Sequence, residues 1–240
     1  MPAIPEQMTN ILGEAPVEDR HGRLSFTTDV FVDPKDIRDK SALNIGCGYG
    51  WFELWALSAG VRKITGTEIG DENLSTARKH ISDTRAAFEV ASAIDLKYPE
   101  SSFDTVTSWE VIEHIPKGTE PKMFLEVARV LKPGGVFYLS TPNKNLLSIT
   151  FDVAFWLNKH RHYSPAELGG MAERAGLRVE RADIKAGWLE IADIWNMFAS
   201  KWIFRRERFF KNKSLLLSDV SYRRPGGFNS LFMKFRKHGS

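Results

Sequence analysis

The chain has 240 residues, 42% of them hydrophobic and 26% charged, so it is long enough to bury a substantial core. Cys47 is its one cysteine, which excludes an internal disulfide bond and makes a reducing cytoplasm the expected compartment. No run of 18 uncharged apolar residues indicates a membrane-spanning helix, and the first ten residues lack the basic-then-apolar pattern of a signal peptide.

The net charge of +3 is unevenly distributed, because basic residues are concentrated near the C-terminal end of the sequence. From residue 201 onward there are eleven Lys and Arg but two acidic residues, whereas residues 1–200 carry 22 basic and 28 acidic residues. This asymmetry suggests an anionic partner, such as a membrane surface, for the C-terminal segment. A solvated tail is the alternative.

Apolar runs and turn residues predict a regular alternation of strands and helices. Residues 1–40 contain four prolines and predict an irregular arm with a short helix at 34–39. Strands are predicted at 42–45, 63–67, 87–91, 103–108, 136–140, 177–184 and 229–236, and helices at 49–58, 73–82, 121–131, 165–175 and 188–210. Such alternation favours a parallel sheet with helices on both faces.

The pattern divides the chain into three segments. They are an N-terminal arm (1–40), a core (41–185), and an aromatic, basic helical insertion with the last strand (186–240). Ser164 is the expected N-cap of the helix that begins at Pro165. In residues 188–202, apolar side chains recur at i, i+3, i+4 and i+7, which predicts an amphipathic helix with an aromatic stripe.

A glycine-rich segment, residues 43–50, follows the first predicted strand and opens a helix. Glycine tolerates positive φ and lets the main chain approach a ligand closely. Glu68 lies 22 residues after Gly46, at the end of the next predicted strand, where a carboxylate can accept hydrogen bonds from both hydroxyls of a ribose. Together these features indicate a nucleotide-type ligand, although each alone also fits an ordinary turn or a surface acid.

The spacing within the loop bears on which ligand it binds. Gly46, Gly48 and Gly50 form G-x-G-x-G, in which the third glycine comes one residue earlier than in the G-x-G-x-x-G of dinucleotide loops. The loop also supplies no lysine for phosphates. A ligand without phosphates fits better, and S-adenosylmethionine is such a ligand. A nicotinamide-dependent oxidoreductase is the less favoured alternative.

With these and further blocks, the chain resembles the class I S-adenosylmethionine-dependent methyltransferases, particularly the small-molecule branch that includes ubiquinone-biosynthesis O-methyltransferases. The matching blocks are residues 43–50, 67–68, 103–106, 111–115, 131–135, 141–143 and 175–177. The resemblance implies an α/β, Rossmann-like, doubly wound fold. Its seven-stranded sheet would be mostly parallel with an antiparallel last strand, and helical insertions would cover the acceptor site.

The same resemblance implies a set of cofactor-binding residues. The loop glycines would cradle the methionine part, Glu68 would bind the ribose, Ile69 would lie against adenine, and residues 108–110 would line the pocket near the sulfonium. The implied set is Asn44, Gly46, Cys47, Gly48, Gly50, Glu68, Ile69, Ser92, Ala93, Ser108, Trp109 and Glu110.

Two positions depart from the family pattern. The family usually has an acid two residues before the first loop glycine, where this chain has Asn44, which can hydrogen-bond but carries no charge. The Asp that often meets the adenine amino group is replaced by Ser92, with the Ala93 N–H in reach of a ring nitrogen. These departures predict modest cofactor affinity and leave open a cofactor-binding subunit that has lost catalysis.

Methyl transfer to oxygen is helped by a general base, and two histidines are candidates. His114 follows the fourth predicted strand, and His162 precedes the helix at residue 165; an imidazole with a pKa near about 6.5 can accept a proton at neutral pH. No acid or cysteine joins His160 and His162 at metal-ligand spacing, so no metal site is expected. Magnesium-assisted methylation of a catechol is the lesser alternative.

Basic and aromatic residues alternate in residues 205–213, which suits an interface with anionic lipid. No RNA or DNA module is present, so a nucleic-acid partner is not expected. The predicted function is therefore O-methylation of a small-molecule, lipid-linked or glycan acceptor, with peripheral contact to the inner face of a membrane through residues 188–213. Transfer to carbon or nitrogen is an alternative, and the sequence does not reveal the oligomeric state.

Overall fold

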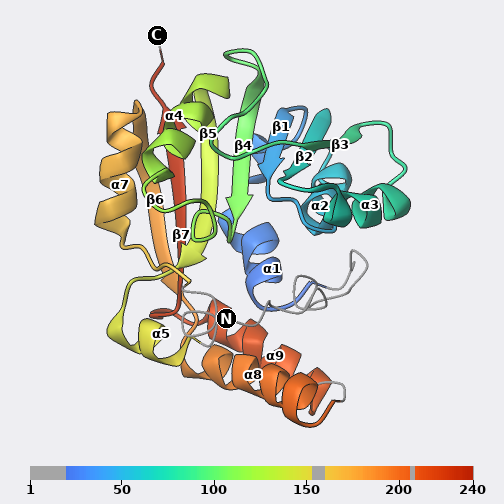
Figure 1. Cartoon of the computed structure of the whole chain (residues 1–240), viewed down its shortest axis with the longest axis vertical. Helices are drawn as coiled ribbons and strands as arrows, with labels where there is room; N and C mark the ends of the chain where they lie inside the picture. Colours follow the sequence, from blue (N-terminus) through green and yellow to red (C-terminus); the bar gives the residue numbers. More distant parts are fainter. Residues whose placement is uncertain (1–19, 153–159, 206–208, 240) are drawn as a thin grey trace.

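A computed structural model describes residues 20–239 except 153–159 and 206–208, with no side-chain description for Asn73 and Trp202 (Figure 1). Seven strands form one sheet in the order β3-β2-β1-β4-β5-β7-β6. The strands are β1 (Ser41–Ile45), β2 (Lys63–Glu68), β3 (Ala86–Val90), β4 (Phe103–Trp109), β5 (Leu131–Pro142), β6 (Leu177–Lys185) and β7 (Ser230–Lys237). All seven strands predicted from the sequence are present.

The direction of the strands follows the predicted scheme. The pairs β1–β2, β1–β4, β2–β3 and β4–β5 are parallel, whereas β7 lies antiparallel between β5 and β6. Six strands therefore run one way and the last strand runs the other way, which confirms the doubly wound, mostly parallel sheet. The chain-order reversal between β1 and β4 creates a crevice at the carboxyl ends of these strands, where α/β sheets bind ligands.

Side chains alternate between two cores because successive residues of a strand point to opposite faces of the sheet. In β5, Phe137 and Leu139 belong to the core under α4 and α7, whereas Val136 and Tyr138 belong to the core under α2 and the N-terminal helical segment. All four of these side chains are almost fully buried. The sheet is thus covered on both faces, as the unbroken apolar runs predicted.

The principal helices are α1 (Arg23–Phe26), α2 (Trp51–Ser58), α3 (Asp71–His80), α4 (Glu120–Val130), α5 (Leu146–Phe151), α7 (Pro165–Arg174), α8 (Trp188–Phe198) and α9 (Lys211–Arg223). Ser164 caps α7 with a complete capping box: its hydroxyl accepts from Glu167 N–H, and the Glu167 carboxylate accepts from Ser164 N–H. The N-cap read from the sequence is therefore confirmed.

The prediction of an irregular N-terminal arm is wrong for residues 23–31. This segment forms α1 and a π-helical turn, Thr27–Phe31. Phe26 and Phe31 pack on Phe232 of β7, with ring centroids 4.9 and 5.4 Å away, so tertiary packing rather than local periodicity makes the segment helical. The short helix expected at 34–39 is a 3₁₀ turn, Pro34–Asp36, and residues 1–19 lie outside the described part of the chain.

The single helix predicted at residues 188–210 is also corrected. Regular helix ends at Phe198, a π-helical turn spans Ala199–Ile203, and α9 follows as a second helix that the sequence analysis missed. Figure 1 shows α5, α8 and α9 together at the end of the molecule toward which β4 and β5 point. In the described residues, no helix is both long and apolar enough to cross a membrane.

Candidate active site

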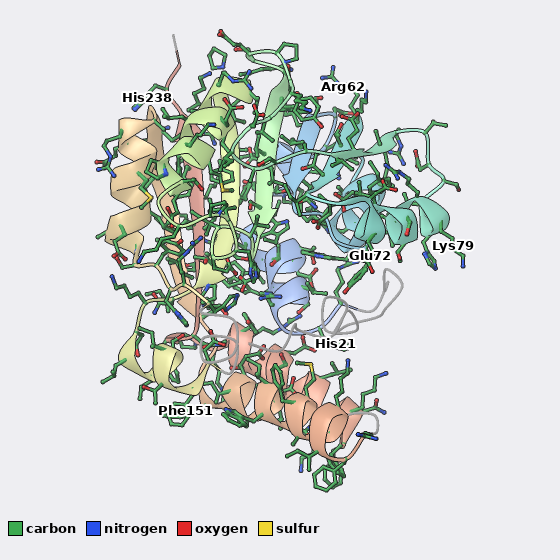
Figure 2. All side chains as sticks on the ribbon, in the orientation of Figure 1. His21, Arg62, Glu72, Lys79, Phe151 and His238 are labelled. Carbon is green, nitrogen blue, oxygen red and sulfur yellow. The ribbon has the colours of Figure 1, made fainter. Side chains whose placement is uncertain are left out.

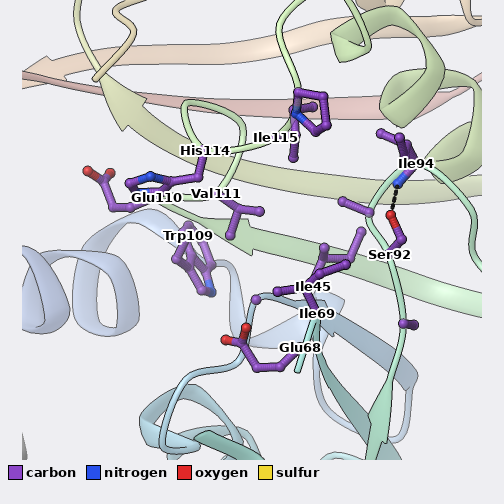
Figure 3. A pocket seen from close by; sticks show the side chains of 14 residues that line it. Ile45, Glu68, Ile69, Ser92, Ile94, Trp109, Glu110, Val111, His114 and Ile115 are labelled. Carbon is purple, nitrogen blue, oxygen red and sulfur yellow. Dashed lines mark hydrogen bonds between the residues drawn. The ribbon is translucent and has the colours of Figure 1, made fainter. Parts of the chain in front are cut away.

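The first cavity, of about 440 Å³, lies at the crevice between the carboxyl ends of β1 and β4 (Figure 3). Segments that follow β1, β2, β3 and β4 contribute its walls, so residues distant in sequence converge on one space. Its lining includes Ile45, Gly46, Glu68, Ile69, Ser92, Ala93, Ile94, Trp109, Glu110, Val111, His114 and Ile115. Seven residues of the predicted cofactor set are among them.

The glycine loop forms the floor of this cavity at Gly46. Its φ is +73°, and a Cβ placed there would lie 2.3 Å from Cγ2 of Val111, so a larger residue fits neither the backbone nor the space. The N–H groups of Gly46 and Cys47 both donate to the carbonyl of Thr67 in β2. The loop is therefore held against the strand that carries Glu68.

The carboxylate of Glu68 projects toward the same space. Its Oε1 accepts a hydrogen bond from the main-chain N–H of Gly48 at 2.7 Å, which ties the end of β2 to the loop. Burial raises its pKa, and hydrogen bonds from the N–H groups of Gly48 and Ile69 act in the opposite direction. Ile69 is 76% exposed and lines the cavity with an apolar side chain.

The sequence analysis placed Asn44 in the cofactor-binding set, but the structure does not place its side chain in the cavity lining. Its side chain is fully buried beneath the loop, where Nδ2 donates to Oε1 of Glu53 at 2.8 Å and Oδ1 accepts from the hydroxyl of Thr107, also at 2.8 Å. Asn44 therefore connects β1, β4 and α2 from below, because both ends of its amide are engaged inside the protein. Burial raises the pKa of its partner Glu53 to about 7.

Four other residues of the predicted set, Cys47, Gly48, Gly50 and Ser108, lie outside the cavity lining. A Cβ on Gly50 would lie 2.5 Å from Ile81, so this glycine permits close packing of the loop against the segment after α3. Cys47 is buried, and burial raises the pKa of its thiol far above the ordinary value, which agrees with a packing role and not a nucleophile. The Ser108 hydroxyl is fully buried without a hydrogen-bond partner among the described residues.

A second cavity, of about 170 Å³, adjoins the first and shares Glu110 with it. It lies between the carboxyl end of the sheet and the helices of the C-terminal segment. Its lining combines charged and aromatic side chains with apolar ones: Arg23, Glu110, Phe151, Asp152, His160, His162, Glu190, Ile191, Ile194, Phe198 and Tyr222. The helical insertion therefore covers a site next to the first cavity, where a second reactant has room.

Glu110 occupies the boundary between the two cavities in an unusual backbone conformation. Its φ of +56° lies in the left-handed region, which non-glycine residues adopt at a cost of about 1 kcal/mol or more. Oε1 accepts from the Ser140 hydroxyl at 2.8 Å, and Oε2 pairs with Arg23 at 2.7 Å. Partners from two separate segments, β5 and α1, thus fix this carboxylate, which lines both cavities.

A cluster of histidines and acids lies beside Glu110. Nε2 of His114 and Nε2 of His160 are 3.2 Å apart, and Nδ1 of His160 is 3.1 Å from Asp152. His162 also pairs with Asp152, at 3.2 Å, and its side chain is only 2% exposed. Although burial raises the pKa of Asp152, the hydrogen bonds from the two histidines hold it well below the usual range.

A neighbouring arginine holds this cluster in place. Arg161 donates to the carbonyls of Ile112 and Ile115, which fastens the histidine segment to the loop after β4. Burial lowers the pKa of His114, with a smaller contribution from His160, and favours its neutral form. The sequence analysis named His114 and His162; it missed His160 and Asp152 as partners because no spacing rule joins them to a loop 46 residues earlier.

Comparison with known proteins agrees with this geometry. Residues 43–139 match the model of a methyltransferase domain. The ubiquinone biosynthesis O-methyltransferases of Neisseria meningitidis serogroup C and Paraburkholderia phymatum are 32% and 35% identical to this chain, over 62% and 61% of it and 68% and 67% of their own lengths. The chain belongs to the class I S-adenosylmethionine-dependent methyltransferases.

A solved S-adenosylmethionine-dependent methyltransferase from Mesorhizobium loti shares the fold of this methyltransferase. The two superpose with a TM-score of 0.61 at 20% identity, over 88% of this chain and 96% of that one. Some further ubiquinone biosynthesis relatives are matched over less than two thirds of their length, for example 61% in Idiomarina loihiensis.

The first cavity fits S-adenosylmethionine, the cofactor of this family. Oε1 of Glu68 is bound to Gly48, so its second oxygen would accept from a ribose, and the exposed side chain of Ile69 would lie against adenine. The indole Nε1 of Trp109 is buried at the cavity without a hydrogen-bond partner among the described residues, and such a donor fits a ligand that carries acceptor groups. The bound cofactor supplies an activated methyl group, and the protein supplies position and shelter from water.

Proposed function

We propose that this methyltransferase transfers the methyl group to a hydroxyl oxygen of a bulky, lipid-linked aromatic acceptor that enters the second cavity. The observation that carries the proposal is the shared lining residue Glu110, which places a polar, histidine-bearing cavity directly beside the cofactor cavity. In-line displacement requires the acceptor atom next to the methyl group, and a cavity at this place satisfies that requirement.

Deprotonation of the acceptor hydroxyl is the remaining chemical task. His160 and His162 line the second cavity, and both pair with Asp152. His114 lines the first cavity and contacts His160. We place the acid–base function in this cluster, with His114 and His162 as the candidates that the sequence named and His160 added by its position. The names of the curated relatives favour oxygen as the acceptor atom.

A lipid-linked acceptor is favoured by the surface that surrounds the second cavity. Phe151 of α5, labelled in Figure 2, packs edge-on against Trp188 of α8. The ring centroids are 5.2 Å apart, and Trp188 remains 54% exposed. Trp195, Ile203, Phe204 and Phe210 are also exposed on this part of the molecule. Aromatic side chains mixed with exposed Arg205, Lys211 and Lys213 suit the headgroup region of an anionic membrane.

The test measures S-adenosylhomocysteine formation by the full chain with four probes. These are a catechol with a farnesyl chain, the same catechol without the chain, an amine of similar size and a hexose. We expect turnover with both catechols and a kcat/KM at least about tenfold higher for the farnesyl compound, because burying a hydrocarbon chain contributes binding energy. Turnover limited to the amine or the sugar contradicts the proposal. So does an absence of turnover in protein that binds S-adenosylhomocysteine.

A further inference from the structure

We propose that Glu53 is a positioning residue for cofactor binding, because its side chain joins the two ends of the glycine loop inside the protein. Nδ2 of Asn44 donates to Oε1 of Glu53 at 2.8 Å, and both side chains are fully buried. Asn44 belongs to β1 and Glu53 to the first turn of α2, so this hydrogen bond closes the segment 45–52, which contains all three loop glycines. Neither residue lines the first cavity, so Glu53 would act on the cofactor only through the loop.

Asn44 is held in one orientation by partners from the strands on both sides of β1. Its Oδ1 accepts from the hydroxyl of Thr107 in β4 at 2.8 Å, and its carbonyl accepts from the hydroxyl of Thr67 in β2 at 3.3 Å. Because the amide oxygen faces Thr107, the amide nitrogen faces Glu53 and donates to it. The carbonyl of Thr67 accepts from the first two N–H groups of the loop. The loop, β2 and the Asn44 side chain therefore form one hydrogen-bonded unit, and Glu53 attaches α2 to it.

The space for the Glu53 carboxyl comes from Gly66 in β2, which is the register partner of Asn44 in the sheet. A Cβ on Gly66 would lie 2.7 Å from Oε1 of Glu53 and 2.9 Å from Cβ of Cys47 in the loop. Gly66 does not have a left-handed backbone, so space and not conformation requires glycine at this position. The missing side chain in β2 thus accommodates both the acid from α2 and the loop above it.

The pair places an acid on the helix and an amide on the strand. The chain has Asn44 where the family usually has an acid, a departure that alone predicts modest cofactor affinity. The structure supplies the hydrogen-bond acceptor from α2 instead, and position 44 supplies the donor. We therefore expect cofactor affinity to depend on the pair and not on the residue at position 44 alone.

The contact does not depend on the charge of the acid. Burial raises the pKa of Glu53 to about 7, and a carboxyl oxygen can accept from Asn44 whether or not the group holds a proton. An amide oxygen at the same place can accept equally well. The hydrogen bond across the loop therefore makes Glu53→Gln the conservative variant, whereas Glu53→Leu has no acceptor.

The test measures the affinity of the full chain for S-adenosylhomocysteine by calorimetry, at a temperature at which each variant is folded. The affinity of Glu53→Leu should fall by at least about tenfold, because the loop loses the hydrogen bond that closes it. Glu53→Gln should bind about as tightly as the wild type. Cofactor binding is the readout, so the outcome does not depend on the acceptor or on the proposed function.

An exchange of the two groups tests the contact itself. Asn44→Asp removes the donor and brings two carboxyl groups together, so affinity should fall by at least about tenfold. Adding Glu53→Gln restores one donor and one acceptor with their positions exchanged, because the new amide nitrogen can donate to the new carboxylate. The double variant should therefore recover most of the affinity that Asn44→Asp loses, which simple loss of stability would not produce.

Tyr138→Phe is the matched control for a purely structural effect. It removes a buried hydrogen bond to Asp36 outside both cavity linings, so it should lower Tm without changing affinity. Circular dichroism shows whether each variant is folded.

Unchanged affinity in folded Glu53→Leu overturns the inference, as does a tenfold loss in folded Glu53→Gln. If Glu53→Leu does not fold, the comparison of Asn44→Asp with the double variant decides. A double variant that binds no better than Asn44→Asp then overturns the inference, and recovery of affinity supports it.

Discussion

The carboxylate of Glu68, which lines the first cavity, and the main-chain N–H of Gly48 are joined by a hydrogen bond of 2.7 Å. This contact engages one carboxylate oxygen, so the second oxygen would accept from the cofactor ribose. One acid therefore orders the loop and would also bind the sugar, which would connect the conformation of the loop with cofactor affinity.

Replacement of Glu68 by glutamine should weaken binding of S-adenosylhomocysteine by about 10- to 100-fold, because hydrogen bonds to a charged acceptor contribute about 1.5–3 kcal/mol. Isothermal calorimetry measures the change. Glu72→Gln is the matched control, since Glu72 is an exposed acid on the neighbouring helix α3 (Figure 2). Unchanged affinity in Glu68→Gln would remove the ribose role of this residue.

The sequence predicted Glu68 because one side chain at one strand end carries the signal. It could not predict what Asn44 does, because the partners of Asn44 come from β4 and α2 and only the folded chain brings them together. The same reason explains the missed His160 and Asp152. Strand positions, in contrast, were predictable from local apolar runs, whereas α1 and α9 depend on tertiary contacts with β7 and α8.

Glu53 gives the protein a specific dependence of stability on pH. Its pKa is about 7 in the folded chain, where burial disfavours the charged form, against the ordinary 4.5 when unfolded. Between these values the folded state holds a proton that the unfolded state has lost, so the free energy of unfolding falls as pH rises, by about 1 kcal/mol per pH unit. Below pH 4.5 both the folded and the unfolded state hold the proton, so the free energy of unfolding no longer depends on pH through Glu53.

Glu53→Gln should remove this dependence, because a neutral amide can still accept from Asn44. Urea unfolding of both proteins at about pH 5, 6 and 7 measures it: the wild type should lose about 2 kcal/mol relative to the variant across this interval. Parallel stability curves would show that Glu53 is charged in the folded protein, contrary to the pKa that its burial produces.

The apolar end of the molecule leads to a prediction about membranes. Ile203 is 73% and Phe210 82% exposed, and both lie close in sequence to exposed Arg205, Lys211 and Lys213. Full-length protein should therefore float with vesicles that contain phosphatidylglycerol and much less with vesicles of phosphatidylcholine alone, since each basic side chain near an anionic surface contributes about 1 kcal/mol.

The double variant Ile203→Ser with Phe210→Ser should reduce the vesicle-bound fraction at equilibrium by at least about tenfold, because the two side chains lose apolar area that a bilayer would bury. Leu125→Ser is the matched control: Leu125 is 55% exposed on α4, away from the helices α5, α8 and α9 (Figure 1). Equal loss in both variants would indicate general apolar adhesion. Unchanged flotation of the double variant would place the membrane contact elsewhere and weaken the case that the acceptor reaches the second cavity from a lipid surface.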